Sequence, residues 1–240
     1  MVLQLEDFRC EFSEQDFLDF CSEYYIPAAV HPELPDPNAT IADFPAGKVG
    51  VYARLFEFAN QRIPLTRFFC DVLAFYEIHI SQLHCIGAAK LTNFEINCRL
   101  MAITPTLNLF RAFYHRTWSN GWVSFAKRGK SPYQCYTDKL DSLRNWREFF
   151  FWVDQRVFPY DFAFHTQASL TRDERPLPGT YSEADAQTIN TNRIGICAYP
   201  EEFQVHMGIS RNYFQPETEI PIFYDENGQG GCSFFTPFCA

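Results

Sequence analysis

Apolar residues recur at the three- and four-residue spacing of an α-helix over much of the first half of the chain. After Pro64 this pattern is regular through Leu65, Phe68, Phe69, Val72, Leu73 and Tyr76. Such a stripe marks the buried face of an amphipathic helix, and Pro64 suits its first turn. A second helix is predicted from Ser13, a suitable N-cap, and carries Phe17, Phe20, Cys21, Tyr24 and Tyr25.

Three shorter helices are predicted from weaker patterns between residues 81 and 118. The first begins near Ser81 and breaks or bends near Gly87. Thr92 and Glu95 form a capping-box pattern, which indicates the start of the next helix. The third follows Pro105 and carries Leu107, Phe110, Phe113, Tyr114 and Trp118.

Other segments are predicted from composition more than from periodicity. Residues 26–48 hold Pro27, Pro32, Pro35, Pro37 and Pro45, a density that forbids regular helices or sheets and predicts an extended arm. Val49–Phe58 is apolar and fits either a strand or a helix, since its periodicity does not decide. In the final third, short helices are predicted over Ser182–Thr191 and Pro200–Met207.

The period of the pattern changes after residue 120. Trp122–Ala126 and Tyr133–Thr137 read as the arms of a hairpin, joined by the basic turn 127–132, which contains Gly and Pro. Phe149–Val153 is a third candidate strand, and its unbroken apolar run suggests burial on both faces. The predicted fold class is therefore α+β, with a predominantly helical core followed by a small antiparallel sheet of a hairpin plus one strand.

Composition and the first residues of the chain indicate a cellular compartment. Aromatic residues make up 18% of the 240-residue chain, and 26 residues are Phe, so we expect a Phe-rich core. The chain begins with acids rather than the basic and apolar regions of a secretory signal, and no apolar run reaches the roughly 18–20 residues of a membrane span. The nine Cys fit reduced core thiols. We predict an intracellular protein, cytoplasmic or nuclear, that is neither secreted nor transmembrane and has no membrane partner.

The net charge of −9 is distributed unevenly along the chain. It is −9 over residues 1–44, +2 over 45–110, +5 over 111–156 and −7 over 157–240. A basic middle between acidic ends permits a local nucleic-acid patch. It equally permits the acidic ends to neutralise the middle within the same chain, and the sequence leaves both interpretations open.

Candidate nucleic-acid contacts lie on and near the predicted hairpin. Lys127, Arg128 and Lys130 occupy its turn and could neutralise phosphates, and Arg144 and Arg147 follow nearby. The arms carry aromatic residues that could stack on bases: Trp122, Phe125, Tyr133 and Tyr136. In the alternative interpretation, these aromatic side chains face the core and the charges form a solvated tip.

Sequence motifs for catalysis, cofactors and metals are absent. The nearest metal-like cluster, His79, His84, Cys85 and Cys98, matches no zinc module and is interpreted as core packing. The sequence contains no phosphate-binding glycine motif, no Asp-Thr-Gly protease motif, no Asp-Asp pair and no Gly-x-Ser-x-Gly elbow. We therefore predict no catalytic, cofactor-binding or metal-binding residue, no enzyme activity and no small-molecule substrate.

Several segments of the chain can be compared with known families. They include IADFPAGKVGVYARLFEFANQRIPLTRFF at 41–69, PTLNLFRAFY at 105–114, WREFFFWVD at 146–154 and YPEEFQVHMGISRNY at 199–213. In this order they resemble the gypsy-type transposon domain of plants, a family also labelled a transposase. The residue patterns predict an acidic N-terminal helix over 1–25 and a Pro-rich arm over 26–48, and the resemblance adds the transposon domain over 49–213. An irregular tail over 214–240 looks truncated or frame-altered.

The resemblance implies a protein of a plant gypsy-class retrotransposon that lies apart from the polymerase and the integrase, with no established catalytic residues. The leading hypothesis is a non-enzymatic structural or assembly module that self-associates through an apolar helix face. One alternative is a nucleic-acid-binding module that uses the basic hairpin. Another is a degenerate transposon relic without a selected function.

Overall fold

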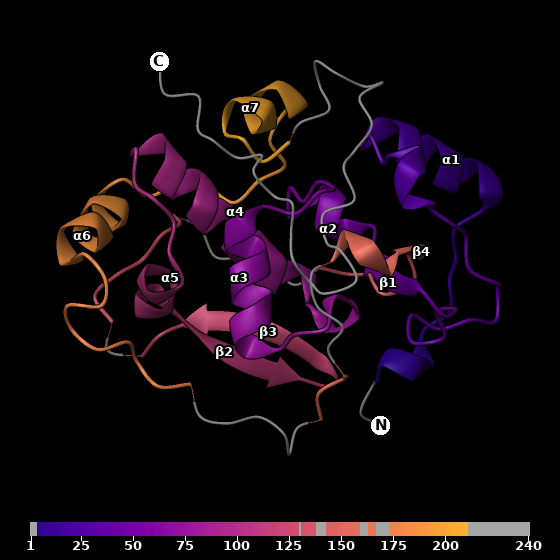
Figure 1. Ribbon diagram of the computed structural model, residues 1–240, viewed down its shortest axis with the longest axis horizontal. Helices are drawn as coiled ribbons and strands as arrows, with labels where there is room; N and C mark the ends of the chain where they lie inside the picture. Colours follow the sequence, from indigo (N-terminus) through magenta and orange to yellow (C-terminus); the bar gives the residue numbers. More distant parts are fainter. Residues whose placement is uncertain (1–3, 130, 138–142, 159–162, 167–172, 211–240) are drawn as a thin grey trace.

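The computed structural model describes residues 4–129, 131–137, 143–158, 163–166 and 173–210 (Figure 1). Across these residues, helices and two antiparallel sheets of two strands each pack around one hydrophobic cluster. The predicted α+β class is confirmed. The strands, however, form two separate pairs rather than one small sheet.

The two most regular helices are present where the apolar stripes predict them. Helix α1 spans Glu14–Glu23, and the Ser13 hydroxyl accepts a hydrogen bond from its first turn, as predicted. Helix α3 spans Arg67–Tyr76 and buries most of its apolar stripe. Its N-cap is Thr66, so Pro64 precedes the first turn and the predicted position of Pro64 within that turn is wrong. A threonine hydroxyl can accept a bond from the helix, which a proline cannot do.

The region predicted as two helices around Gly87 is one continuous helix. After the short 3₁₀-helix η3, Ile80–Gln82, helix α4 runs without a break over Cys85–Leu100. Thr92 lies inside α4, where its hydroxyl donates to the carbonyl of Ala88 at 3.2 Å. The predicted break and the predicted capping box are therefore both wrong.

Burial explains why the pattern of α4 was misleading. Twelve of its sixteen residues are buried, so the helix has no polar face and no amphipathic stripe. Gly87 serves packing rather than a bend, because a Cβ added there would lie 3.0 Å from the Cα of Ser124. The missing side chain lets a strand of the second sheet approach the helix backbone.

Helix α5 ends earlier than its apolar pattern predicts. It spans Leu107–Phe113 and is capped by the Thr106 hydroxyl. Strand β2 follows at once over Tyr114–Ser119. The apolar positions Tyr114 and Trp118 therefore belong to a strand, and the prediction of helix through Trp118 is wrong.

The hairpin of the second sheet uses a different turn from the predicted one. Strand β2 pairs with β3, Trp122–Lys127, around Asn120 and Gly121. Both turn residues have positive φ, 50° and 102°, which the tight two-residue hairpin turn requires and which Asn-Gly favours. The predicted turn begins at Lys127, which is the last residue of β3, and 133–137 forms only an isolated bridge rather than a strand.

The first sheet joins two strands that lie far apart in the sequence. Strand β1, Lys48–Tyr52, pairs antiparallel with β4, Phe150–Asp154, so that Gly50 lies opposite Trp152. The third predicted strand is therefore confirmed one residue further along the chain, but it pairs with β1 and not with the hairpin. Gly50 allows Ile41 to press onto β1, because a Cβ there would lie 2.6 Å from Ile41 Cγ1.

The segments around β1 settle two open sequence questions. Val49–Phe58 is a strand followed by a helix, since α2 spans Arg54–Glu57. The Pro-rich arm has only the 3₁₀-helix η2, Ala28–Val30, and an isolated antiparallel bridge from Glu33 to Trp152. Before β1 the arm therefore has no α-helix and no sheet strand, and Glu33 lies against the outer edge of β4.

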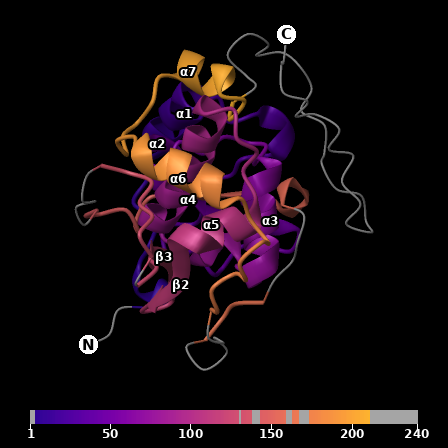
Figure 2. The same ribbon diagram turned by 90° about the vertical axis from the view of Figure 1, so that its left-hand side faces the viewer.

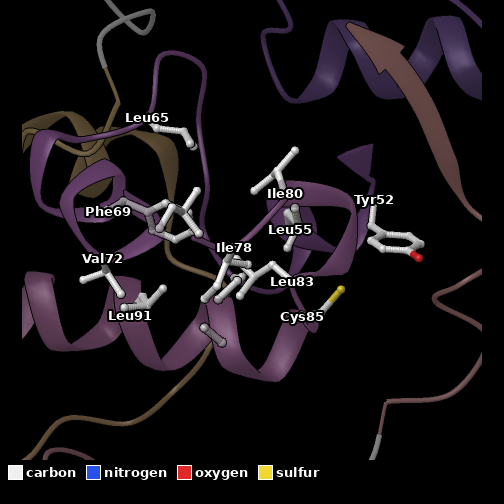
Figure 3. Close-up of a cluster of buried hydrophobic side chains, with 14 of the residues drawn as sticks. Tyr52, Leu55, Leu65, Phe69, Val72, Ile78, Ile80, Leu83, Cys85 and Leu91 are labelled. Atoms are coloured by element: carbon white, nitrogen blue, oxygen red, sulfur yellow. The ribbon is translucent and has the colours of Figure 1, made fainter. Parts of the chain in front are cut away.

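The core is rich in Phe, as the composition predicts. Figure 3 shows apolar side chains converging from several elements, among them Leu55 of α2, Phe69 of α3 and Leu91 of α4. Burying each large ring stabilises the fold through the apolar area removed from water. The buried phenylalanines are Phe17, Phe20, Phe56, Phe68, Phe69, Phe94, Phe110, Phe113, Phe125, Phe150, Phe151 and Phe158.

The remaining helices lie at the periphery. The 3₁₀-helices η1 and η4 span Leu5–Asp7 and Gln155–Val157, and the two predicted late helices are confirmed as α6, Glu183–Thr191, and α7, Glu201–His206. Figure 2 shows α7 and the β2–β3 hairpin at opposite ends of the molecule, as does Figure 1. None of the described helices is long and apolar enough to span a bilayer. The predicted tail, 214–240, lies outside the described residues.

Candidate functional site

The five basic residues predicted to contact nucleic acid do not form one exposed patch. Lys127, the last residue of β3, is exposed, and so is Arg144. Arg128 is buried with 8% of its surface exposed, and Arg147 is half-buried. Lys130 lies outside the described residues. The predicted tip of the hairpin is therefore not a cluster of solvated cations.

Arg147 is held inside an aromatic cluster. Its guanidinium carbon lies 5.1 Å from the ring centroid of Phe8, 4.8 Å from that of Trp122 and 4.9 Å from that of Trp146. A cation over aromatic faces is attracted to their negative π-systems, more strongly where water is excluded. Arg147 thus joins the N-terminal segment to the hairpin rather than pointing at a ligand.

The aromatic residues around the predicted hairpin face the interior. Trp122 and Phe125 are each 1% exposed, and Tyr133 is 8% exposed. The indole N–H of Trp122 donates to the hydroxyl of Tyr52 at 3.0 Å, and the half-buried ring of Tyr136 stacks on that of Tyr114. The alternative interpretation, in which these rings pack on the core, is the one the structure supports.

A buried carboxylate joins the basic middle to the acidic final third. One oxygen of Asp173 lies 3.5 Å from Arg111 Nη2, and the other lies 3.1 Å from Arg128 Nη2. The Tyr76 hydroxyl and the backbone N–H of Arg116 donate to the second oxygen at 2.8 and 2.9 Å. Burial, followed by the charge of Asp173, raises the pKa of Tyr76, so its hydroxyl keeps the proton that it donates.

A second buried carboxylate lies inside α4. Glu95 is 1% exposed and accepts hydrogen bonds from the Thr66 hydroxyl at 2.5 Å and from Arg99 Nη2 at 2.6 Å. Burial raises the pKa of Glu95, opposed by the charge of Arg99. Arg99 also donates to the carbonyl of Met207 at 2.8 Å. This network ties the end of α7 to α3 and α4.

Other polar residues fix the same C-terminal segment to the loop before α3. Arg62 forms an ion pair with Glu201 of α7, with both Nε and Nη2 at 2.8 Å from one carboxylate oxygen. Asn60 donates to the carbonyl of Cys197 and accepts from the backbone N–H of Tyr199, both at 2.8 Å. A charge pair desolvated in this way holds its partners in one geometry.

The four residues of the metal-like cluster lie too far apart to act together. Cys85 and Cys98 are thirteen residues apart on α4, which places them about 20 Å apart along the axis. His84 caps α4, with its Nδ1 accepting from the N–H of Ile86 at 3.1 Å. In the described part of the chain, no group of three or more His, Cys, Asp or Glu side chains could hold a metal ion.

Most residues of these networks were not singled out from the sequence. Asp173 and Glu201 carry no local motif, and their arginine partners lie in other segments of the chain. Glu95 was predicted to belong to a capping box, whereas it pairs with Arg99 four residues further along α4. The one usable signal is the opposite sign of neighbouring charge blocks, +5 over 111–156 and −7 over 157–240.

Comparison with known proteins agrees with the sequence resemblance over the central segment. Residues 51–117 match a family model described as "Putative gypsy type transposon". The match runs from β1 to β2 and so includes α2 to α5. No curated protein and no solved structure matches the chain.

Residues 51–117 are therefore similar to the gypsy-type transposon family. The resemblance stated from the sequence is confirmed over this segment. The wider limits, 49–213 for the domain, 1–25 for the acidic helix and 26–48 for the arm, stay predictions.

Proposed function

We propose that this chain is a non-enzymatic module of a plant gypsy-class retrotransposon that acts inside the cell by self-association. The proposal is supported by how its buried polar groups are used. The carboxylates of Glu95, Asp173 and Glu201 are each paired with arginines from other parts of the fold or from the next helical turn. They stabilise the arrangement of the elements, which is what a rigid interaction module requires.

The observation that carries the proposal is an exposed stripe on α3, which we call the α3 stripe. It consists of Arg67, Asp71 and Phe75, spaced four residues apart on one side of the helix. Phe75 is 46% exposed, and Arg67 and Asp71 form a surface ion pair at 2.7 Å. An aromatic anchor next to a pair of opposite charges is suited to a two-fold contact, where each charge of one copy can meet its opposite on the other.

The test is the mass of the full chain in solution, measured by light scattering as its concentration rises from micromolar to hundreds of micromolar. Self-association predicts a mass that increases towards twice that of one chain. A mass that stays at one chain over the whole range contradicts the proposal.

Nucleic-acid binding through the basic middle is the second proposal, favoured by the exposure of Lys127 and Arg144. Arg128 and Arg147 favour it less, since their guanidinium groups are engaged within the fold. A transposon relic without a selected function is the remaining alternative, and it predicts neither a dimer nor RNA binding.

A further inference from the structure

Four donor groups, two in ion pairs and two in hydrogen bonds, converge on the carboxylate of Asp173 from three elements and from the segment after β3. They are the guanidinium groups of Arg111 from α5 and Arg128 after β3, the Tyr76 hydroxyl from α3 and the backbone N–H of Arg116 in β2. We call these four groups the oxyanion cradle. Guanidinium groups combined with a hydroxyl and a backbone amide are the donors that proteins use to hold phosphate oxygens.

The charges in the oxyanion cradle do not balance. Two guanidinium groups face a single carboxylate, and the side chains of Arg111, Arg128 and Asp173 are only 14%, 9% and 4% exposed. An excess cation in this surrounding attracts an anion more strongly than the same cation in water would. The Nε atom of Arg111 is also buried and has no hydrogen-bond partner among the described residues.

The segment 173–174 occupies the oxyanion cradle with its backbone as well. Arg128 Nη1 donates to the carbonyl of Asp173 at 2.9 Å, and Arg111 Nη2 donates to the carbonyl of Glu174 at 2.7 Å. Three oxygen-bearing groups of this segment thus lie where the oxygens of a phosphate could be bound. The side chain of Glu174 is exposed and takes no part in these contacts.

We propose that the oxyanion cradle is a phosphate-binding site for a single-stranded RNA, kept closed by Asp173. The exposed Lys127 immediately precedes Arg128 and offers a charge for a neighbouring phosphate, which favours a polymer over an isolated phosphate. Binding requires the 173–174 segment to leave the cradle. The apparent affinity of the wild-type chain is reduced by the fraction of molecules that are closed.

The test compares Asp173→Ala with Glu174→Ala in the full chain. Each substitution removes one negative charge, but only the first removes the group that occupies the oxyanion cradle. Binding to a fluorescent oligouridylate is measured by anisotropy at low and high salt. We expect Asp173→Ala to bind roughly tenfold tighter than wild type, with a gain that declines as salt rises, and Glu174→Ala to bind like wild type.

Two controls connect the gain to the oxyanion cradle. The double variant D173A/R111Q is expected to lose the gain, and inorganic phosphate is expected to raise the Tm of Asp173→Ala more than that of wild type. If Asp173→Ala does not fold, Asp173→Asn preserves the side-chain volume and is likewise expected to bind RNA more tightly than wild type and Glu174→Ala.

Equal RNA affinity of the Asp173 and Glu174 variants overturns the proposal, and so does stabilisation by phosphate without any gain in RNA binding. Asp173 and Glu174 lie outside the α3 stripe, so their single variants leave self-association to be tested independently. Arg111 lies over the Phe75 ring at 4.5 Å, so R111Q is used for RNA binding only.

Discussion

A neutral histidine caps the longest helix of the fold. His84 accepts a hydrogen bond from the N–H of Ile86 through Nδ1, so that nitrogen must carry no proton. Burial, followed by the charges of Arg147 and Lys90, lowers the pKa of His84 from 6.5 to about 4. The cap is therefore intact at neutral pH and is lost only in acid, when Nδ1 of His84 takes up a proton.

His84→Asn is expected to make the stability of the protein less dependent on pH. The folded pKa of His84 lies below its unfolded value, so the unfolded state takes up a proton first, and stability is lost as pH falls from about 6.5 towards 4. Between pH 7 and pH 5 the titration of His84 lowers the free energy of unfolding by about 1–2 kcal/mol. Asparagine keeps a capping acceptor without this titration. Urea unfolding of both proteins at the two pH values measures the difference, and equal losses would show that His84 is not responsible.

Some residue roles are readable from the sequence, whereas others depend on contacts across the chain. Ser13 was predicted as an N-cap because capping is local and involves residues three positions apart. Arg62 pairs with Glu201 across 139 positions, and no local rule connects them. The candidate nucleic-acid residues failed as a cluster for the same reason, since the partner of Arg128 is Asp173.

At the scale of elements, α4 shows what a local glycine rule misses. A glycine inside a helical pattern weakens the helix locally, which favours a break near Gly87. The structure has none, because Gly87 is the point of closest approach between α4 and β3 at Ser124. The tertiary contact outweighs the intrinsic preference.

Gly87→Ala is expected to destabilise the protein by about 1–3 kcal/mol, since the new methyl group would lie 3.0 Å from the Cα of Ser124. This is the opposite sign to intrinsic helix propensity, which favours alanine by about 1 kcal/mol. Gly129→Ala is the matched control, because Gly129 has no neighbour within 4 Å of an added Cβ and should change stability by less than about 0.5 kcal/mol. Urea unfolding compares them, and a stabilised Gly87 variant would refute the packing role.

The sheets were predicted in part, because turn chemistry is local but strand pairing is not. The sequence contains two turn signals, Asn120-Gly121 and the basic stretch 127–132. Among their described residues, which leave out residue 130, positive φ angles of a tight hairpin occur only at Asn120 and Gly121. The apolar run before Asp154 predicted β4 but not its partner. Its pairing with β1 depends on the close approach that Gly50 permits beside Trp152 and Ile41.

At the scale of the whole molecule, the uneven charge along the chain is partly neutralised on folding. Asp173 from the acidic final third pairs with Arg111 and Arg128 of the basic middle, and Glu201 pairs with Arg62. Of the two interpretations of the charge pattern, these contacts support neutralisation within the chain. The same contacts fix α7 and the 173–174 segment on α3, α4 and α5 and leave the α3 stripe exposed.

The most direct test of the proposed function is the effect of Phe75→Ser on self-association, compared with Leu18→Ser on α1. Leu18 is 55% exposed, so both substitutions remove an exposed apolar side chain, but only Phe75 belongs to the α3 stripe. Light scattering over a range of concentrations gives the mass of each full-length variant and of wild type. We predict that wild type and Leu18→Ser dimerise alike and that Phe75→Ser dimerises at least about tenfold more weakly. A wild-type chain that stays monomeric, or a Phe75→Ser chain that dimerises as wild type does, would contradict the account.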